Sequence, residues 1–157
     1  MHVGDTLLWG LLATGLLTTL LRACQALHLT RMDTTLLLGT IVTPHRDRAK
    51  IIGFVIHFLN GWWMAAIYVL FFHGLGMATW WLGALMGMAH TAFILVAVLP
   101  FLPGLHPRMA SDSMGPRPTR MLEPPGFLAL NYGYRTPFAV LIAHIAYGAV
   151  LGAFYRL

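Results

Sequence analysis

The sequence predicts an all-α protein, a four-helix transmembrane bundle that forms a single integral membrane domain over residues 1–157. Two features of composition and length support this prediction. Hydrophobic residues make up 58% of the chain and charged residues only 10%, whereas soluble domains carry about 25% charged residues. Four apolar stretches are also long enough to cross a bilayer, which takes about 20 helical residues. The basic residues, a third feature, gather in the loops on one side of these stretches.

The predicted spans cover about 5–29, 50–72, 78–99 and 137–155, and a loop rich in proline and glycine covers 100–136. The first stretch resembles a signal peptide, but it lacks a positive n-region and its apolar run is longer than a usual h-region. We therefore expect it to be retained as the first span. The sequence HGLG at 73–76 predicts a tight turn, and Pro100, Pro103 and Pro137 predict helix ends.

A short helix is predicted between the first two spans, at about 32–43, within the sequence MDTTLLLGTIVTP. It is too short to span a bilayer, so we expect an interfacial or re-entrant helix, with Asp33 or Thr34 as its N-cap. The loop 100–136 is apolar near 127–130. We expect it to fold back over the adjacent mouth of the bundle.

The positive charges predict an orientation in the inner membrane. The loops 30–49 and 100–136 carry or adjoin nearly all the basic residues, namely Arg31, Arg46, Arg48, Lys50, Arg108, Arg117, Arg120 and Arg135. The positive-inside rule makes these loops cytoplasmic and places both termini outside. Because the net charge of +5 is spread over one membrane face, without interleaved aromatic residues, it is not the pattern of a nucleic-acid-binding surface.

We expect specific roles for two sets of charged residues near the membrane surface. Arg46, Arg48 and Lys50 would attract anionic lipid headgroups at about 1 kcal/mol each, or else act only as a topology signal, with Asp47 paired to a neighbouring arginine. Arg22 lies near the loop-side end of the first span, where its side chain can extend to the surface or else turn inward and pair with Asp33 or Glu123.

Three histidines are predicted to lie at a common depth in the membrane. His57 lies seven residues past Lys50, His90 ten before Pro100, and His144 seven past Pro137. At 1.5 Å per residue, each lies about 10–15 Å from the cytoplasmic edge of its span. Each also shares a helical face with glycines, which mark close helix contacts. The three imidazoles are therefore expected to face protein, as membrane-buried ionisable groups usually do.

Histidines on facing helices indicate a site for a transition metal (Cu, Zn or Fe) or for a haem held from both sides. The predicted ligands are His57, His90 and His144, with His106 and Glu123 as further metal ligands. Polar side chains that could orient these ligands are Asn60, Tyr147 and His28. In the competing interpretation, the histidines bond neighbouring carbonyls or hydroxyls and only pack.

The predicted function is thus that of an integral membrane protein with a histidine-lined site for a metal or haem, with a redox role as one use of that site. One alternative is a structural subunit or assembly factor of a larger membrane complex. Another is a small transporter formed as a homo-oligomer, with the G-x-x-x-G of Gly148 and Gly152 as its interface. The single Cys24 excludes an internal disulfide and any C-x-x-C motif, and no P-loop or Rossmann fingerprint is present.

The chain resembles small bacterial four-span membrane proteins known only as domains of unknown function. The resemblance rests on MDTTLLLGTIVTP, IGFVIHFLNGW, LPGLHPRMAS, LEPPGFLALNYG and AHIAYGAVLGAFY, which cover most of the chain outside the first span. It implies a four-span fold and a bacterial membrane location, and it assigns no catalytic residues.

Overall fold

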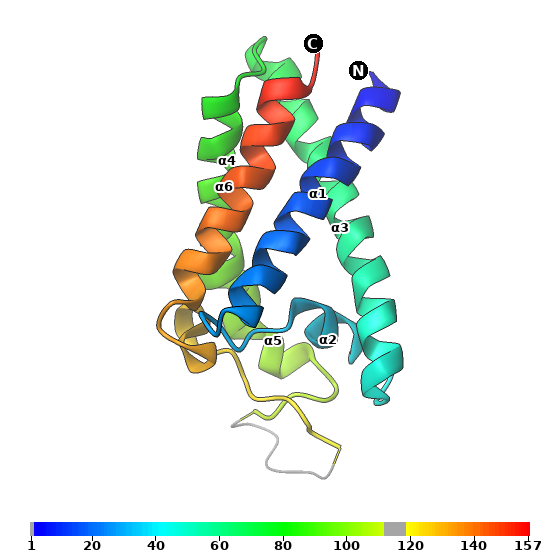
Figure 1. The fold of residues 1–157 in the computed structure, drawn as a ribbon, viewed down its shortest axis with the longest axis vertical. Helices are drawn as coiled ribbons and strands as arrows, with labels where there is room; N and C mark the ends of the chain where they lie inside the picture. Colours follow the sequence, from blue (N-terminus) through cyan, green and yellow to red (C-terminus); the bar gives the residue numbers. More distant parts are fainter. Residues whose placement is uncertain (1, 112–118) are drawn as a thin grey trace.

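The computed structural model describes residues 2–111 and 119–157, and these are helical apart from their turns and loops. Four long helices lie side by side (Figure 1). They are α1 (Val3–Ala26), α3 (Arg46–Leu75), a continuous third helix over Trp80–Leu105, and α6 (Thr136–Phe154). Each is long and apolar enough to cross a membrane. The structure therefore confirms the predicted helical class and the four long apolar helices.

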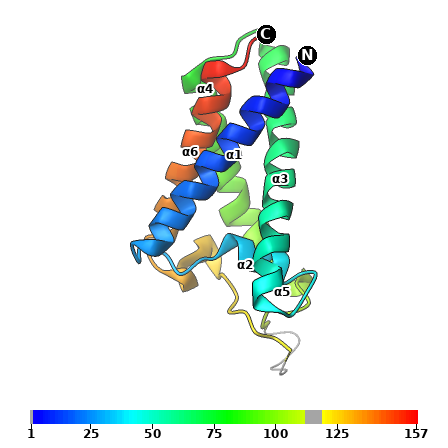
Figure 2. The ribbon, with the colours of Figure 1, turned by 45° about the vertical axis from the view of Figure 1, so that its right-hand side comes forward.

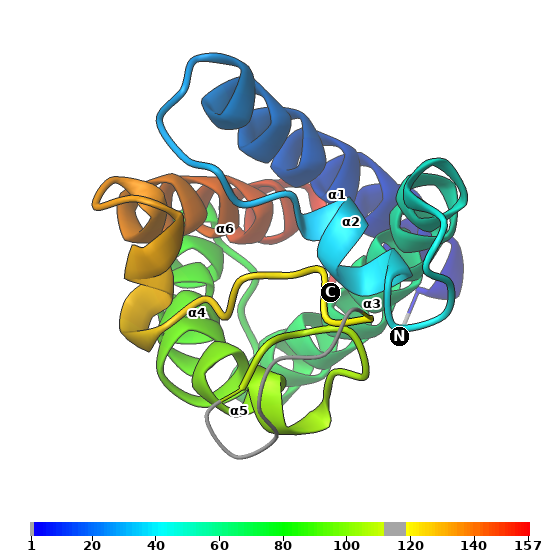
Figure 3. The same cartoon turned by 90° about the horizontal axis from the view of Figure 1, so that it is seen from below.

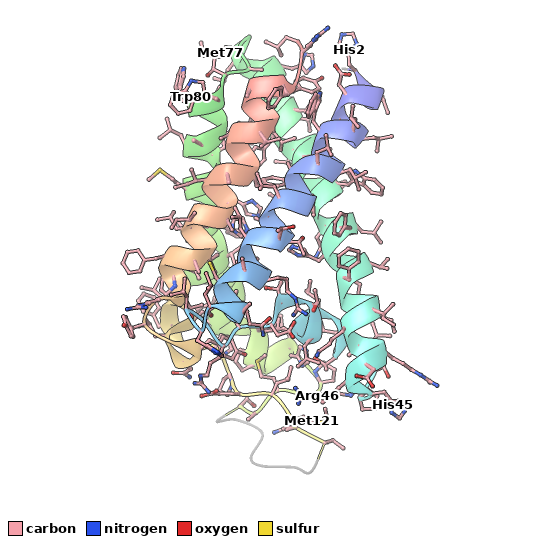
Figure 4. All side chains as sticks on the ribbon, viewed as in Figure 1. His2, His45, Arg46, Met77, Trp80 and Met121 are labelled. Atoms are coloured by element: carbon pink, nitrogen blue, oxygen red, sulfur yellow. The ribbon has the colours of Figure 1, made fainter. Side chains whose placement is uncertain are left out.

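The two ends of the bundle differ in what they carry. Both chain termini lie at one end, here called the terminal end, and the long connections lie at the opposite end, here called the loop end (Figure 1). Figure 4 places His45 and Arg46 at the loop end, and His2 and Trp80 at the terminal end. This is the predicted grouping of loops and termini. Residues 112–118 of the predicted loop, with Arg117, lie outside the described residues.

The third helix consists of α4 (Trp80–Phe93), the π-helical turn η1 (Ile94–Val98) and α5 (Leu99–Leu105). The predictions that Pro100 and Pro103 end this helix are wrong, because both prolines lie within α5. Proline lacks an N–H, and its ring clashes with the carbonyl one turn earlier in an α-helix. The wider π turn directly before Pro100 relieves that clash, so the helix continues to Leu105 and ends at the extended residue His106.

The short helix α2 (Thr34–Gly39) packs beneath the bundle against the first turns of α3. Asp33 caps it as predicted, since one carboxylate oxygen accepts the N–H of Leu36 at 3.0 Å. The helix is shorter than the predicted 32–43. Two glycines allow its close approach to α3, because a Cβ on Gly39 would overlap the carbonyl of Ala49, and one on Gly53 would overlap the carbonyl of Thr35.

α4 packs closely against α6 through small residues. A Cβ on Gly83 would overlap the carbonyl oxygen of Gly148, and one on Gly152 would overlap that of Thr79. The G-x-x-x-G of α6 is therefore buried inside the chain. The prediction that Gly148 and Gly152 form an oligomer interface is wrong, because α4 already occupies that face.

The described parts of the loop 100–136 fold back against the loop end, as predicted (Figure 3). Met109 and Ala129 are almost completely buried there. Ala129 belongs to the 3₁₀ turn η2 (Phe127–Tyr132), in which Leu128 and Ala129 both have left-handed backbone angles. The hydroxyl of Tyr132 donates to the carbonyl of Glu123 at 2.6 Å and ties this turn to the segment before it.

Candidate histidine site

Two of the three predicted histidines meet between α4 and α6. The rings of His90 and His144 have their centroids 4.8 Å apart and an interplanar angle of 79°. The helices can approach this closely because Gly87 on α4 lies against the backbone of His144, with no side chain between them. The predicted meeting of imidazoles from distant parts of the chain therefore holds for this pair.

The tautomer of neutral His144 follows from its hydrogen bond. Its ring is buried, and Nδ1 lies 2.8 Å from the carbonyl oxygen of Val140, one turn earlier in α6. A carbonyl only accepts, so Nδ1 carries the proton and donates. The lone pair of a neutral imidazole is then on Nε2. This is the arrangement in which a histidine acts as a metal ligand, with one nitrogen held by the protein and the other available.

His57 lies on α3, and its Nε2 is buried without a hydrogen-bond partner among the described residues. The imidazole is within electrostatic range of His144, as is that of His90. Buried polar atoms usually find a partner, and an orphaned one indicates strain, a functional role, or a water or ion. His57 therefore brings an unsatisfied nitrogen to the vicinity of the His90–His144 pair.

Two tyrosines complete this polar region. The hydroxyl of Tyr68 lies 3.4 Å from Nδ1 of His90. Tyr147, which we predicted to support the site, donates its hydroxyl to the carbonyl of Gly61 at 2.6 Å. The two tyrosine rings pack edge to face, with centroids 5.5 Å apart. Sequence reasoning missed Tyr68, although it lies seven residues past Gly61 on the same face of α3.

Two other predicted supporting residues lie outside the site. Asn60 is exposed on α3 and not buried on the glycine face with His57. Asn60 lies about one helical turn from His57 along α3. Its side chain is rotated around the helix axis away from that of His57, so it points outward. His28 is exposed at the end of α1, where it lines a separate cavity of about 240 Å³ with Tyr132 and Arg135. The predictions that Asn60 and His28 support the histidines are therefore wrong.

His106 is not available as a metal ligand, because both of its ring nitrogens are already used. Nδ1 accepts the N–H of Arg108 at 3.1 Å, so Nε2 carries the proton and donates to the carbonyl of Leu37 at 3.0 Å. Burial lowers the pKa of His106; its bond to Leu37 opposes that shift, and the charge on Arg108 adds to it. The predicted ligand thus acts as a neutral link between α2 and the end of α5.

Arg108 contacts the same end of α2. Its guanidinium donates to the carbonyls of Thr40 at 2.6 Å and Ile41 at 3.1 Å. The last carbonyls of a helix lack partners within it, and a cation near them is favourable. The motif LHPR, which we expected to position polar groups at the mouth, therefore fastens α2 to the bundle. We refer to His106 and Arg108 as the α2 clip.

Glu123 also lies away from the histidines. Its carboxylate forms an ion pair with Arg31 at 3.3 Å at the loop end, where the glutamate side chain is 48% exposed. Burial raises the pKa of the nearby Tyr132 to about 12, and the charge on Glu123 adds to the effect. The prediction that Glu123 is a metal ligand is therefore wrong for this arrangement.

The described residues contain no group of three or more His, Cys, Asp or Glu side chains arranged to hold a metal ion. The five predicted ligands thus do not form one centre. The His90–His144 spacing suits an ion better than a haem. Two imidazoles on one tetrahedral ion, at metal–nitrogen distances near 2.0 Å, have ring centroids about 5 Å apart. Ligands on opposite sides of a haem iron would have centroids about 6 Å apart, with a porphyrin between them.

Comparison with protein-family models, with characterised proteins and with solved structures gives no match for this chain.

Proposed function

We propose that this protein is a multi-pass membrane protein that binds one transition-metal ion at His90 and His144, with His57 as the third ligand. The observation that supports this proposal most directly is the buried, unpartnered Nε2 of His57, which lies within electrostatic range of His144. In the packed arrangement the three imidazoles are not a ligand set. The proposal therefore includes a rotation of the His57 side chain toward the pair on metal binding.

The membrane part of the proposal is supported by the outward faces of the helices, which are apolar along their length (Figure 4). Leu8 and Leu12 on α1, Leu59 and Trp63 on α3, and Ile142 on α6 are each 48–69% exposed. Such a continuous apolar surface would be unfavourable in water and indicates contact with lipid or another membrane chain. The basic residues at the loop end favour its placement in the cytoplasm, in the inner membrane of a bacterium.

The ligand chemistry favours a monovalent ion. The site offers neutral imidazoles, and the described residues place no acidic side chain or thiol with them to hold a metal. The cost of moving an ion from water into a low-dielectric interior rises with the square of its charge. Among the metals that imidazole binds well, Cu⁺ therefore has a lower burial cost here than Zn²⁺ or Fe²⁺. We propose Cu⁺ as the preferred ion.

A second function is favoured by the bonds that the histidines already make. His144 donates to Val140, and His90 lies beside the hydroxyl of Tyr68. These contacts are what purely packing histidines would make. In that case the chain is a structural subunit or assembly factor of a larger membrane complex and binds no metal.

Metal binding by the purified protein separates the two functions. Detergent-solubilised protein is titrated with Cu⁺ against a chromophoric chelator, and the metal is counted by elemental analysis. We expect one Cu⁺ per chain. His57→Ala and His90→Ala should each weaken binding by about 100-fold, as expected on removal of one nitrogen ligand. X-ray absorption should show nitrogen neighbours at about 2 Å.

The matched control is His45→Ala. His45 is exposed at the start of α3, and its side chain makes no capping hydrogen bond, so copper binding should be unchanged. Gel filtration confirms that each variant keeps its fold. Absence of stoichiometric copper, or an unchanged affinity in His90→Ala, contradicts the metal function and leaves the structural one. A Soret band in the purified protein would instead identify a haem.

A further inference from the structure

A groove opens on the side of the bundle between α1 and α3, well away from the α4–α6 interface. The two helices diverge toward the loop end, and α2 lies between their lower halves (Figure 2). The resulting groove has a volume of about 330 Å³ and is lined by residues of α1, α2 and α3. It faces outward and not into the bundle, because Ile51 and Val55 on its wall are 70% and 51% exposed.

The polarity of the groove changes along its length. Its upper part is lined by Thr18 of α1 and by Phe54 and Val55 of α3, whereas Arg22 and Lys50 line the part nearest the loop end. On α1, Arg22 lies four residues closer to the loop end than Thr18, and on α3, Lys50 lies five residues closer than Val55. At 1.5 Å per residue, both cations are about 6–8 Å below the apolar part.

The charge at the lower end of the groove is positive and accessible. Lys50 is exposed and has no ion pair with any described residue. Arg22 forms an ion pair with Asp33 at 3.1 Å, yet its side chain is 49% exposed. The hydrogen bond that Leu36 gives to Asp33, with the Arg22 pair, keeps the pKa of Asp33 below its usual value although burial opposes this. One net positive charge, that of Lys50, is therefore uncompensated.

From this arrangement we infer that the groove binds one anionic glycerophospholipid from the leaflet at the loop end. An acyl chain lies along Phe54 and Val55, and the phosphate is held by Lys50 with Arg22 beside it. The vertical order of cations and apolar wall matches the order of headgroup and acyl chain in that leaflet. An anionic lipid is favoured over a zwitterionic one, because the groove lining supplies an unpaired cation and includes no acidic residue; the nearby Asp33 is paired with Arg22.

Native mass spectrometry tests this inference on the full chain released from mixed bilayers of phosphatidylglycerol and phosphatidylcholine. The wild-type protein should retain one phosphatidylglycerol in preference to phosphatidylcholine. Lys50→Gln should reduce that preference by about fivefold, the effect expected from one interfacial cation. Val55→Trp fills the apolar part while leaving both cations in place, and should reduce retention of both lipids.

Two matched variants control for nonspecific effects. Arg48→Gln removes a cation two residues from Lys50 but outside the groove lining, and Leu59→Trp places the same tryptophan side chain at an exposed position of α3 outside the groove. Both should behave as the wild type. The inference is overturned if Arg48→Gln matches Lys50→Gln, if Val55→Trp retains lipid normally, or if glycerol phosphate without acyl chains displaces the lipid. The result is separate from the copper test, since the groove lining includes none of the proposed histidine ligands.

Discussion

The close packing of α4 on α6 makes Gly83 a position where one methyl group should be costly. A Cβ on Gly83 would overlap the carbonyl oxygen of Gly148 and lie 2.7 Å from its carbonyl carbon, whereas ordinary contact begins at 3.4 Å. The helices would have to separate by at least 0.7 Å, the difference between these two distances. A gap of this size forfeits about a quarter to a half of each dispersion contact across the interface.

We therefore expect Gly83→Ala to lower the free energy of unfolding by about 3 kcal/mol, at the upper end of the range for overpacking. The measurement is SDS-induced unfolding in mixed micelles, followed by circular dichroism. The matched control is Gly15→Ala on α1, where a Cβ would have no neighbour within 4 Å. That variant should be unchanged or stabilised by up to about 1 kcal/mol, because alanine favours the helix. If the two variants have equal stability, the α4–α6 packing argument is refuted.

Three further predictions concern polar contacts. Because the pKa of His106 is lowered in the folded state, its stabilising contribution is complete above pH 6.5 and declines as the pH falls below that value. The non-titrating His106→Gln variant should show a smaller loss of unfolding free energy between pH 7 and pH 5, and an equal loss would contradict this. Asp33→Ala should destabilise α2 by about 1–2 kcal/mol through loss of its N-cap, with Asp33→Asn nearer wild type, measured by hydrogen exchange of the α2 amides. Tyr147→Phe should cost about 1 kcal/mol in SDS unfolding, since it removes the hydrogen bond that the Tyr147 hydroxyl donates to the Gly61 carbonyl; no change would show that this bond is not stabilising.

The lengths of the apolar stretches and the turn residues between them were sufficient to predict the four long helices. The predicted boundaries agree with the structure to within a few residues for α1, α3 and α6. They failed at the end of the third helix, where the chain continues past Pro100 and Pro103 to Leu105 after the π turn. The π turn at Ile94–Val98 depends on how the segment packs, and a single sequence carries no clear signal for it.

The candidate site was predictable only in part, for a related reason. The glycine stripes correctly indicated that His90 and His144 face each other, since glycines allow α4 and α6 to touch. Residues in loops gave no such guide. Glu123 and His106 were assigned to the site from their chemistry, but Arg31 and the end of α2 supply nearer partners. Pairing between loops depends on tertiary geometry that helical periodicity does not encode.

The π turn of η1 also has a consequence for insertions and deletions. The five residues of this π turn rotate the chain by about as much as four α-helical residues, because a π turn accommodates about one residue more than an α turn. Removing one residue from Ile94–Val98 should therefore restore ordinary α-helical winding and leave the segment after it in nearly its present phase relative to α4. His106 and Arg108 would still face the carbonyls of α2, whereas removing a residue within α4 would rotate them by about 100°. The extra residue in this turn thus changes the winding of the helix without changing where the α2 clip lies.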